Sequence, residues 1–210
     1  MTNKTIIFDL DDTIFQTKSI HKKTIDPFFE HLSENLQPLY QQEQILCIMD
    51  DLWKYSWDVV LDSYKIPKDV FVRSIKILET LPLDLKISPY PDYQFLKNLK
   101  ADKFLVTTGL THLQEAKINA LNIKNDFNKI FINDRLIEPK TKLDIFKEII
   151  DNYSLVPSKT FVVGDNPHAE IEAGNSLNLT TIQILRNGAV KGNNARHYIH
   201  SFEELKHIIQ

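Results

Sequence analysis

The sequence is poor in residues on which several protein classes depend. Its 210 residues include a single cysteine, Cys47, so no disulfide can form within the chain. None of the five glycines builds a GxGxxG or Walker-type phosphate loop, so dinucleotide-binding and P-loop classes lose their main support. Cys47 lies in the apolar stretch 45–49, where we expect a buried, inert thiol. A lone thiol also fits a reducing cytoplasm.

Strong charge and long apolar runs are absent as well. The net charge of −3 gives no electrostatic reason to expect nucleic acid or an anionic membrane as a partner. No apolar run approaches the roughly 20 residues that a membrane span needs. The first apolar run is not preceded by a basic and apolar leader. We therefore expect a cytoplasmic protein, monomeric or homodimeric, that acts without membrane or nucleic acid.

The apolar pattern predicts an α/β fold. A short apolar run at 5–8 is typical of a buried strand, and from residue 91 onward strand-like runs alternate with helical ones. Several strand-like runs are continuous, as expected where helices cover both faces of a parallel sheet. We predict a doubly wound, Rossmann-like parallel sheet. Its later strands are 103–107, 129–132, 160–163 and 180–185, and its helices are 93–99, 112–121, 141–153, 168–177 and 202–209.

A helical stretch at 15–88 interrupts this alternation directly after the first strand. Asp26-Pro27 is a good helix start, with Asp as N-cap and Pro at the first helical position. Further helical regions run from 41 to 64 and from residue 67 onward. We therefore predict an inserted helical domain at 15–88 and an α/β core formed by 1–14 and 89–210.

Three carboxylates in four positions follow the first apolar run, and Thr13 comes directly after them. In open α/β sheets, ligands bind beyond the carboxyl ends of the strands. Asp9 and Asp11 would share a face on a regular strand, where they repel each other unless a cation or a shared proton intervenes. Hard oxygen donors near one point suit Mg²⁺. The alternative is an acidic turn capped by Thr13.

Polar residues also follow two later predicted strands. Thr107-Thr108 ends one of them and presents a hydroxyl at the same sheet edge. Asp165 ends another, with Glu170 on the next helix, and Lys140 opens a helix between the two strands. Each has an ordinary alternative: Thr107 as a helix cap, Lys140 as a solvated charge, Glu170 as a surface acid. Their joint order makes coincidence a poor explanation.

Taken in order, these residues resemble the haloacid dehalogenase (HAD) superfamily. The resemblance covers the whole chain, because the helical stretch 15–88 occupies the position of the C1 cap in subfamily I. The motifs that carry it are DxDxT (Asp9, Asp11, Thr13), a Ser/Thr motif (Thr107), a lysine motif (Lys140) and an acidic GDxxxx(D/E) motif (Gly164, Asp165, Glu170).

The chain departs from the usual family pattern in three places. Thr108 stands where many members have Asn, and Glu170 where Asp is commoner. Lys140 precedes Thr rather than Pro, and Lys142 lies two residues later. We assign the lysine position to Lys140, because its six-residue distance to Phe146 resembles the spacing in the family.

The resemblance implies phosphoryl transfer through two acids. Asp9 is the expected nucleophile, which forms an aspartyl-phosphate. Asp11 is expected to protonate the departing alkoxide and then to deprotonate the attacking water. Members that resemble dehalogenases lack an acid at this second position, so Asp11 favours phosphatase or phosphomutase chemistry.

The resemblance also implies a magnesium ion. Asp9, the backbone carbonyl of Asp11 and Asp165 are the expected ligands. The ion would screen the nucleophile from the negative charge of the substrate.

The remaining motif residues are expected to bind the phosphoryl group. Thr107, Thr108 and Lys140 would hold its oxygens, with Lys140 supplying positive charge as negative charge develops. Glu170 would orient water or Lys140.

The leading function is that of a Mg²⁺-dependent phosphatase for a small phosphorylated metabolite, such as a sugar phosphate or a nucleotide. A phosphomutase of the same superfamily would share every catalytic residue and transfer the group to another sugar hydroxyl. A non-catalytic HAD-fold binding protein is the third class. It would be expected to lack Asp9, Asp11 or Lys140, and the chain retains all three.

The helical insert offers candidate substrate contacts. His21 and Lys22 could meet an anionic substrate, or form an exposed charge cluster at a helix start. Trp53 and Trp57 lie four residues apart, as on one helix face. They could stack on a base or sugar, or belong to the core of the insert.

Overall fold

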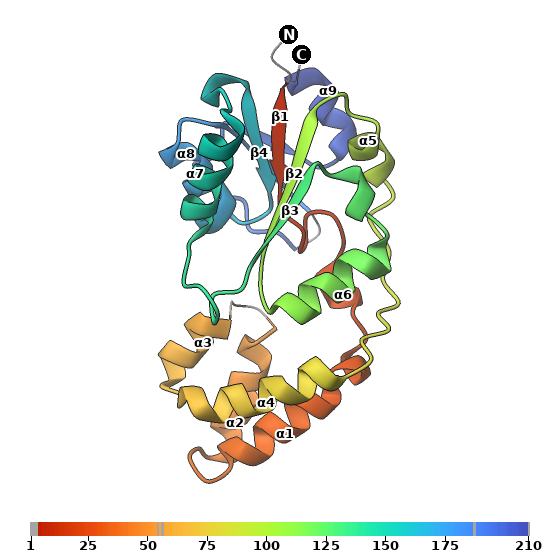
Figure 1. Cartoon of the computed structure of the whole chain (residues 1–210). Helices are drawn as coiled ribbons and strands as arrows, with labels where there is room; N and C mark the ends of the chain where they lie inside the picture. Colours follow the sequence, from red (N-terminus) through yellow and green to blue (C-terminus); the bar gives the residue numbers. More distant parts are fainter. Residues whose placement is uncertain (1–3, 54, 56, 187, 210) are drawn as a thin grey trace.

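A single parallel sheet organises the molecule. The computed structural model describes residues 4–53, 55, 57–186 and 188–209. Within these ranges six parallel strands follow the order β3-β2-β1-β4-β5-β6, so β1 lies between β2 and β4 (Figure 1). The predicted doubly wound sheet is thus confirmed. The strands are β1 (Thr5–Phe8), β2 (Asp102–Thr108), β3 (Lys129–Asn133), β4 (Thr160–Gly164), β5 (Thr180–Ile184) and β6 (His197–Ile199).

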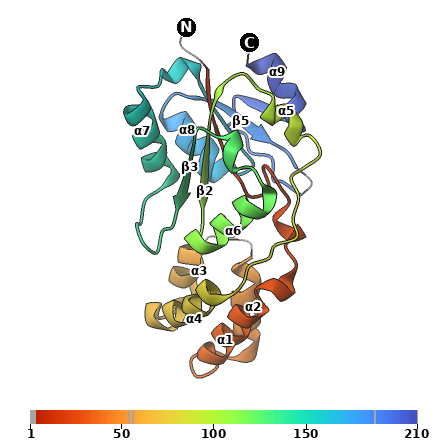
Figure 2. The ribbon, with the colours of Figure 1, turned by 45° about the vertical axis from the view of Figure 1, so that its right-hand side comes forward.

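Helices cover both faces of the sheet. Figures 1 and 2 show α7 (Lys142–Tyr153) and α8 (Glu172–Ser176) on one face, and α5 (Tyr93–Lys97), α6 (Thr111–Leu121) and α9 (Leu205–Ile208) on the other. β1 is buried on both faces: Ile7 packs in the cluster of α7, while Ile6 and Phe8 pack in the cluster of α5 and α6. This explains why its sequence is continuously apolar rather than alternating.

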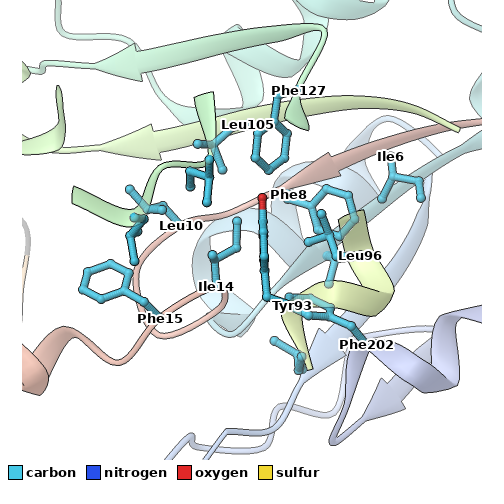
Figure 3. Close-up of a cluster of buried hydrophobic side chains, with 14 of the residues drawn as sticks. Ile6, Phe8, Leu10, Ile14, Phe15, Tyr93, Leu96, Leu105, Phe127 and Phe202 are labelled. Carbon is cyan, nitrogen blue, oxygen red and sulfur yellow. The ribbon is translucent and has the colours of Figure 1, made fainter. Parts of the chain in front are cut away.

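Aromatic packing anchors the centre of the sheet. The ring of Phe8 meets Phe127 edge-on at a centroid distance of 6.2 Å and Phe202 at 5.9 Å (Figure 3). Phe8 and Phe202 are fully buried, and burial of such a side chain stabilises the fold by about 1.5–3 kcal/mol. The residue just before the first acid is therefore held rigidly.

Short helical turns complete the described chain. They are η1 (Thr17–Ser19), η2 (Lys22–Thr24), η3 (Lys124–Asp126), η4 (Pro157–Lys159), the π-helical turn η5 (Pro167–Ile171) and η6 (Phe202–Glu204). The predicted helices at 168–177 and 202–209 are each split into a turn and a short α-helix.

The segment between β1 and α5 forms a helical layer beyond the carboxyl ends of the strands (Figures 1 and 2). Its helices are α1 (Asp26–Leu36), α2 (Gln42–Asp51), α3 (Trp57–Tyr64) and α4 (Lys68–Thr80). They share a buried cluster in which Phe28 stacks on Trp57 at 5.0 Å and meets Phe71 edge-on. Leu110, before α6, packs into the same cluster. No helix in the described ranges is long and apolar enough to cross a membrane.

Three local expectations about this layer are wrong. Helix α1 begins at Asp26 itself, with Ile25 as the capping residue. The helical region predicted at 41–64 is two helices, so Trp53 follows α2 while Trp57 begins α3. Cys47 is exposed, because the apolar side chains that α2 buries are Ile45 and Ile48.

The two chain segments that join the sheet to the helical layer run side by side. Phe15 forms a bridge with Pro89, and the backbone N–H of Tyr90 donates to the carbonyl of Ile14 over 2.9 Å. The guanidinium of Arg186 lies 4.1 Å from the ring centre of Tyr90.

Arg186 ties this junction to the rest of the core. Its guanidinium makes two hydrogen bonds to the carboxylate of Asp92, at 2.8 and 3.1 Å, and two to the carbonyl of Thr13. The side chains of Arg186 and Asp92 are only 8% and 15% exposed. Breaking this ion pair would leave a buried charge without compensation.

We therefore expect Arg186→Ala to lower the free energy of unfolding by about 3 kcal/mol or more, the usual cost of removing one partner of a buried pair. Urea unfolding followed by circular dichroism measures the change. Lys206→Ala is the matched control, since Lys206 pairs with Glu203 on the surface and should contribute less than about 1 kcal/mol. Equal losses in both variants would contradict the structural role of Arg186.

Candidate active site

A cleft of about 700 Å³ separates the carboxyl ends of the strands from the helical layer. Polar residues of the sheet side form one wall, and mostly apolar residues of the helical layer form the other. The first wall includes Asp9, Asp11, Thr107, Thr108, Lys142, Asp165 and Glu170, and the second includes Ile25, Phe29, Leu52, Trp53, Trp57 and Asp58. The predicted strand-end residues are therefore brought together.

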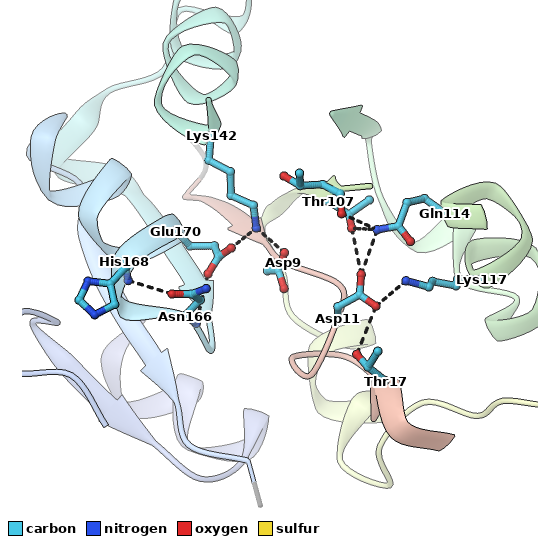
Figure 4. A network of polar contacts seen from close by, with 11 residues as sticks. Asp9, Asp11, Thr17, Thr107, Gln114, Lys117, Lys142, Asn166, His168 and Glu170 are labelled. Carbon is cyan, nitrogen blue, oxygen red and sulfur yellow. Dashed lines mark hydrogen bonds and ion pairs between the residues drawn. The ribbon is translucent and has the colours of Figure 1, made fainter. Parts of the chain in front are cut away.

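Asp9 lies at the end of the central strand. Its backbone N–H still donates to the carbonyl of Val163 over 2.9 Å, so β4 fixes its position. Its side chain is almost fully buried, and Oδ1 lies 2.5 Å from Nζ of Lys142 (Figure 4). Burial raises the pKa of Asp9, although the ammonium of Lys142 acts in the opposite direction. The acid thus has one cationic partner and little water around it.

Lys142 also contacts Glu170, so it bridges two buried carboxyls. Thr141 caps α7 in a reciprocal pair with Asp144, which makes Lys142 the first residue of the helix. Glu170 lies in the π-helical turn, where its other oxygen accepts from the backbone N–H of Asn166 over 3.2 Å. A Cβ on Gly164 would come within 2.7 Å of the Glu170 side chain, so only glycine leaves room for it.

The structure contradicts the assignment of the lysine position to Lys140. The ammonium of Lys140 pairs with Glu138 at 2.8 Å and with Glu148 at 2.6 Å. The cause is the start of α7: the cap at Thr141 leaves Lys140 in the preceding loop and places Lys142 at the cleft. The six-residue spacing to Phe146 was a misleading criterion, because the capping pattern decides which lysine faces Asp9.

Asp11 takes a different set of partners from Asp9. Its Oδ1 lies 2.7 Å from Nζ of Lys117, and its Oδ2 accepts from Nε2 of Gln114 over 2.9 Å (Figure 4). The hydroxyls of Thr17 and Thr107 donate over 3.3 and 3.4 Å. Burial alone would raise the pKa of Asp11, but the charge of Lys117 and the donated hydrogen bonds outweigh it and lower the pKa.

The sequence motifs do not predict three of the side chains that contact Asp11, which are Lys117, Gln114 and Thr17. Gln114 and Lys117 lie three residues apart on α6, so they share one helix face, and both are buried there. Two polar residues at helical spacing, close behind Thr107-Thr108, are the signal that could have identified them. Thr17 begins the turn η1, in the segment that connects β1 to the helical layer.

Thr107 and Thr108 end β2 as expected. Thr107 is fully buried, and its hydroxyl accepts from Nε2 of Gln114 over 2.6 Å. The same amide group donates to the carbonyl of Thr108 over 3.0 Å. Gln114 therefore fixes the end of β2 and the carboxyl of Asp11 together.

The carboxyls on the sheet side of the cleft suit a hard cation. Burial, followed by the charge of Asp9, raises the pKa of Asp165 to about 7. Such mutual repulsion between desolvated carboxylates is relieved by a bound cation. Within the described chain no three His, Cys, Asp or Glu side chains gather as a metal-binding group. The expected set does not need such a trio, because it combines two carboxylates with one backbone carbonyl.

The candidate contacts in the helical layer have different surroundings. Trp57 lines the cleft, yet its ring stacks on Phe28 and its Nε1 donates to the carbonyl of Leu52 over 3.1 Å. His21 is exposed and is not among the described residues that line the cleft. The side chain of Lys22 lies outside what the structure describes.

Comparison with known proteins gives the family context. The model of the family "Haloacid dehalogenase-like hydrolase" matches residues 6–184. The pyrophosphatase PpaX of Oceanobacillus iheyensis is 24% identical over 192 residues, covering 88% of this chain and 84% of that protein. The glyceraldehyde 3-phosphate phosphatase of Methanothermobacter thermautotrophicus is 21% identical over 192 residues, covering 86% and 85%.

A solved structure supports the fold. The HAD-hydrolase YfnB from Bacillus subtilis, crystallised with magnesium, superposes with a TM-score of 0.65 over 100% of both chains. Its sequence identity is 19%, so this likeness concerns the fold alone.

The placement of the two lysines leads to a direct test. We expect Lys142→Ala to slow p-nitrophenyl phosphate hydrolysis, the activity that the family resemblance implies, by about a hundredfold or more, because an unpaired charge in a dry site costs a few kcal/mol. Lys140→Ala should change the rate by less than about threefold, since Lys140 contacts Glu138 and Glu148. Steady-state rates of the two purified variants decide the matter, and the opposite ranking would contradict this placement.

Proposed function

The chain belongs to the haloacid dehalogenase-like hydrolase family, and we propose that it is a Mg²⁺-dependent phosphatase for a small phosphorylated metabolite. The observation that carries the proposal is the contact of the buried Asp9 with Lys142, at the point where β1 delivers its carboxyl to the cleft. A nucleophile beside a buried cation suits attack on a negatively charged phosphoryl group. The names of the two relatives, a pyrophosphatase and a glyceraldehyde 3-phosphate phosphatase, agree with this class.

In the first step, an oxygen of Asp9 attacks the phosphorus of the ester. The bond from phosphorus to the leaving oxygen breaks, and its electron pair goes to that oxygen, which takes a proton from Asp11. Lys142 and the hydroxyl of Thr107 hold the phosphoryl oxygens as their charge develops. The products of this step are a free alcohol and an aspartyl-phosphate.

In the second step, water attacks the aspartyl-phosphate. Asp11, now a carboxylate, takes a proton from the water while the bond between phosphorus and Asp9 breaks. Inorganic phosphate leaves, and both acids return to their starting states. Glu170 supports both steps by holding the ammonium of Lys142 beside Asp9.

Asp9, Asp165 and the backbone carbonyl of Asp11 would hold the magnesium ion. When bound, the ion offsets the negative charge that nucleophile and substrate bring together. The raised pKa values of Asp9 and Asp165 support this assignment: burial raises both, and a neighbouring acid adds to the rise, Asp11 for Asp9 and Asp9 for Asp165.

We further propose that residues 15–88 act as a cap, while 1–14 and 89–210 form the catalytic core. The support is the apolar cluster that α1–α4 share with Leu110 of the core, and the contribution of these helices to the far wall of the cleft. Two adjacent chain crossings, near Phe15 and Pro89, suit rigid-body closure. On this proposal the cap selects the metabolite, and Trp57 is its candidate contact.

Phosphate release from a panel of sugar phosphates, nucleotides and p-nitrophenyl phosphate tests the function. A phosphomutase would instead form an isomeric phosphate ester and release little phosphate.

Asp9→Asn should lower turnover by several orders of magnitude, because the nucleophile is lost at nearly constant volume. Asp151→Asn, an exposed acid on α7, is the control and should keep full activity. More than about a tenth of wild-type activity in Asp9→Asn would remove Asp9 from its role.

Turnover should also depend on the metal ion. Chelation followed by dialysis should abolish hydrolysis, and Mg²⁺ should restore it. Ca²⁺ should restore little, since it prefers more ligands at longer distances than Mg²⁺. The measurement is phosphate release against metal concentration. Full activity in EDTA after exhaustive dialysis would contradict the proposed ligand set.

A further inference from the structure

Asp11 is held mainly by residues outside the family motifs. Four side chains of the described chain lie within hydrogen-bonding distance of its carboxyl. Lys117 and Thr17 donate to Oδ1, and Gln114 and Thr107 donate to Oδ2 (Figure 4). These contacts fix the orientation of the Asp11 carboxyl.

The contacts from α6 are the shortest of the four. Nζ of Lys117 lies 2.7 Å from Asp11, and Nε2 of Gln114 lies 2.9 Å away, against 3.3 Å for Thr17. The side chain of Lys117 is only 7% exposed, so its charge is held in place and little screened by water. Charge-assisted hydrogen bonds of this length are about twice as strong as neutral ones.

The contacts also differ in the part of the molecule that supplies them. Gln114 and Lys117 belong to α6, which packs on the sheet, whereas Thr17 lies in the segment that leads to the helical layer. A movement of that layer would release the contact with Thr17 first. The two contacts from α6 would remain, and with them the position of the Asp11 carboxyl.

We propose that Lys117, assisted by Gln114, is a positioning residue that holds the carboxyl of Asp11 where it can pass its proton to the leaving oxygen. This role rests on the proposed phosphatase function. Lys117 and Gln114 hold the carboxyl of Asp11 at one place in the cleft, where it faces the leaving oxygen in the first step and the attacking water in the second. Such fixed orientation of a catalytic group lowers the barrier of both steps.

The positioning role of Lys117 predicts that its loss affects esters differently according to the acidity of their leaving groups. A p-nitrophenolate ion leaves readily without a proton, whereas an alkoxide needs one as the bond to phosphorus breaks. Loss of a positioned acid should therefore matter little for p-nitrophenyl phosphate and much for an alkyl phosphate. A merely structural defect would slow both esters alike.

The experiment compares Lys117→Met with the wild-type protein on p-nitrophenyl, phenyl and simple alkyl phosphates. Methionine keeps a similar length and apolar stem without the charge. We expect kcat to fall a few-fold on the nitrophenyl ester and about a hundredfold on the alkyl ester, within the range of general acid catalysis. Lys117→Arg should restore much of the alkyl activity, and Lys124→Met, on an exposed turn, should change neither rate.

Gln114→Met is a second variant, for which we expect a smaller loss of kcat that is again greater on the alkyl ester than on the nitrophenyl ester. Should circular dichroism show that Lys117→Met is unfolded, the rates of Gln114→Met test the proposal. Equal losses on all esters would overturn the positioning role while leaving the phosphatase function intact. A wild-type protein that hydrolyses none of these esters and no member of the metabolite panel would overturn both.

Discussion

Negative charge collected at one edge of the sheet is the constraint on which the rest of the structure depends. Parallel strands bring the carboxyls of Asp9, Asp11 and Asp165 to the same cleft, and burial makes their charge costly. Two lysines offset this charge, and they come from opposite faces of the sheet: Lys142 from α7 and Lys117 from α6 (Figures 1 and 4). The helices on the two faces thus do more than cover the apolar strands.

The acids could be predicted from the sequence because their position depends on local rules. A buried run followed by carboxylates must deliver them to the carboxyl edge of a parallel sheet. The lysine was harder, since its choice depends on the residue at which α7 begins. The reciprocal cap of Thr141 and Asp144 was readable, and it outranks the spacing to Phe146 on which the assignment to Lys140 was based.

Other features depend on contacts between residues far apart in the chain. Lys117 is separated from Asp11 by 106 residues, so the spacing of Gln114 and Lys117 can indicate a polar face of α6 but not that this face contacts Asp11. In the helical layer, a four-residue spacing suggested one helix for Trp53 and Trp57, but α2 ends at Asp51. The indole of Trp57 donates to the carbonyl of Leu52 and stacks on Phe28, so tertiary packing overrides the local period.

Asp11 and Asp12 contact Thr17, which begins the segment that leads to the helical layer. Asp12 adopts a left-handed conformation, with φ of 51°, and its carboxylate accepts from the backbone N–H of Thr17 over 2.9 Å. The hydroxyl of Thr17 then donates to Asp11. A displacement of the segment that begins at Thr17 would therefore release one hydrogen bond to Asp12 and one to Asp11, while α6 holds the Asp11 carboxyl from the other side. Under the proposed function, the cap can therefore move about Thr17 while the general acid keeps its position in the core.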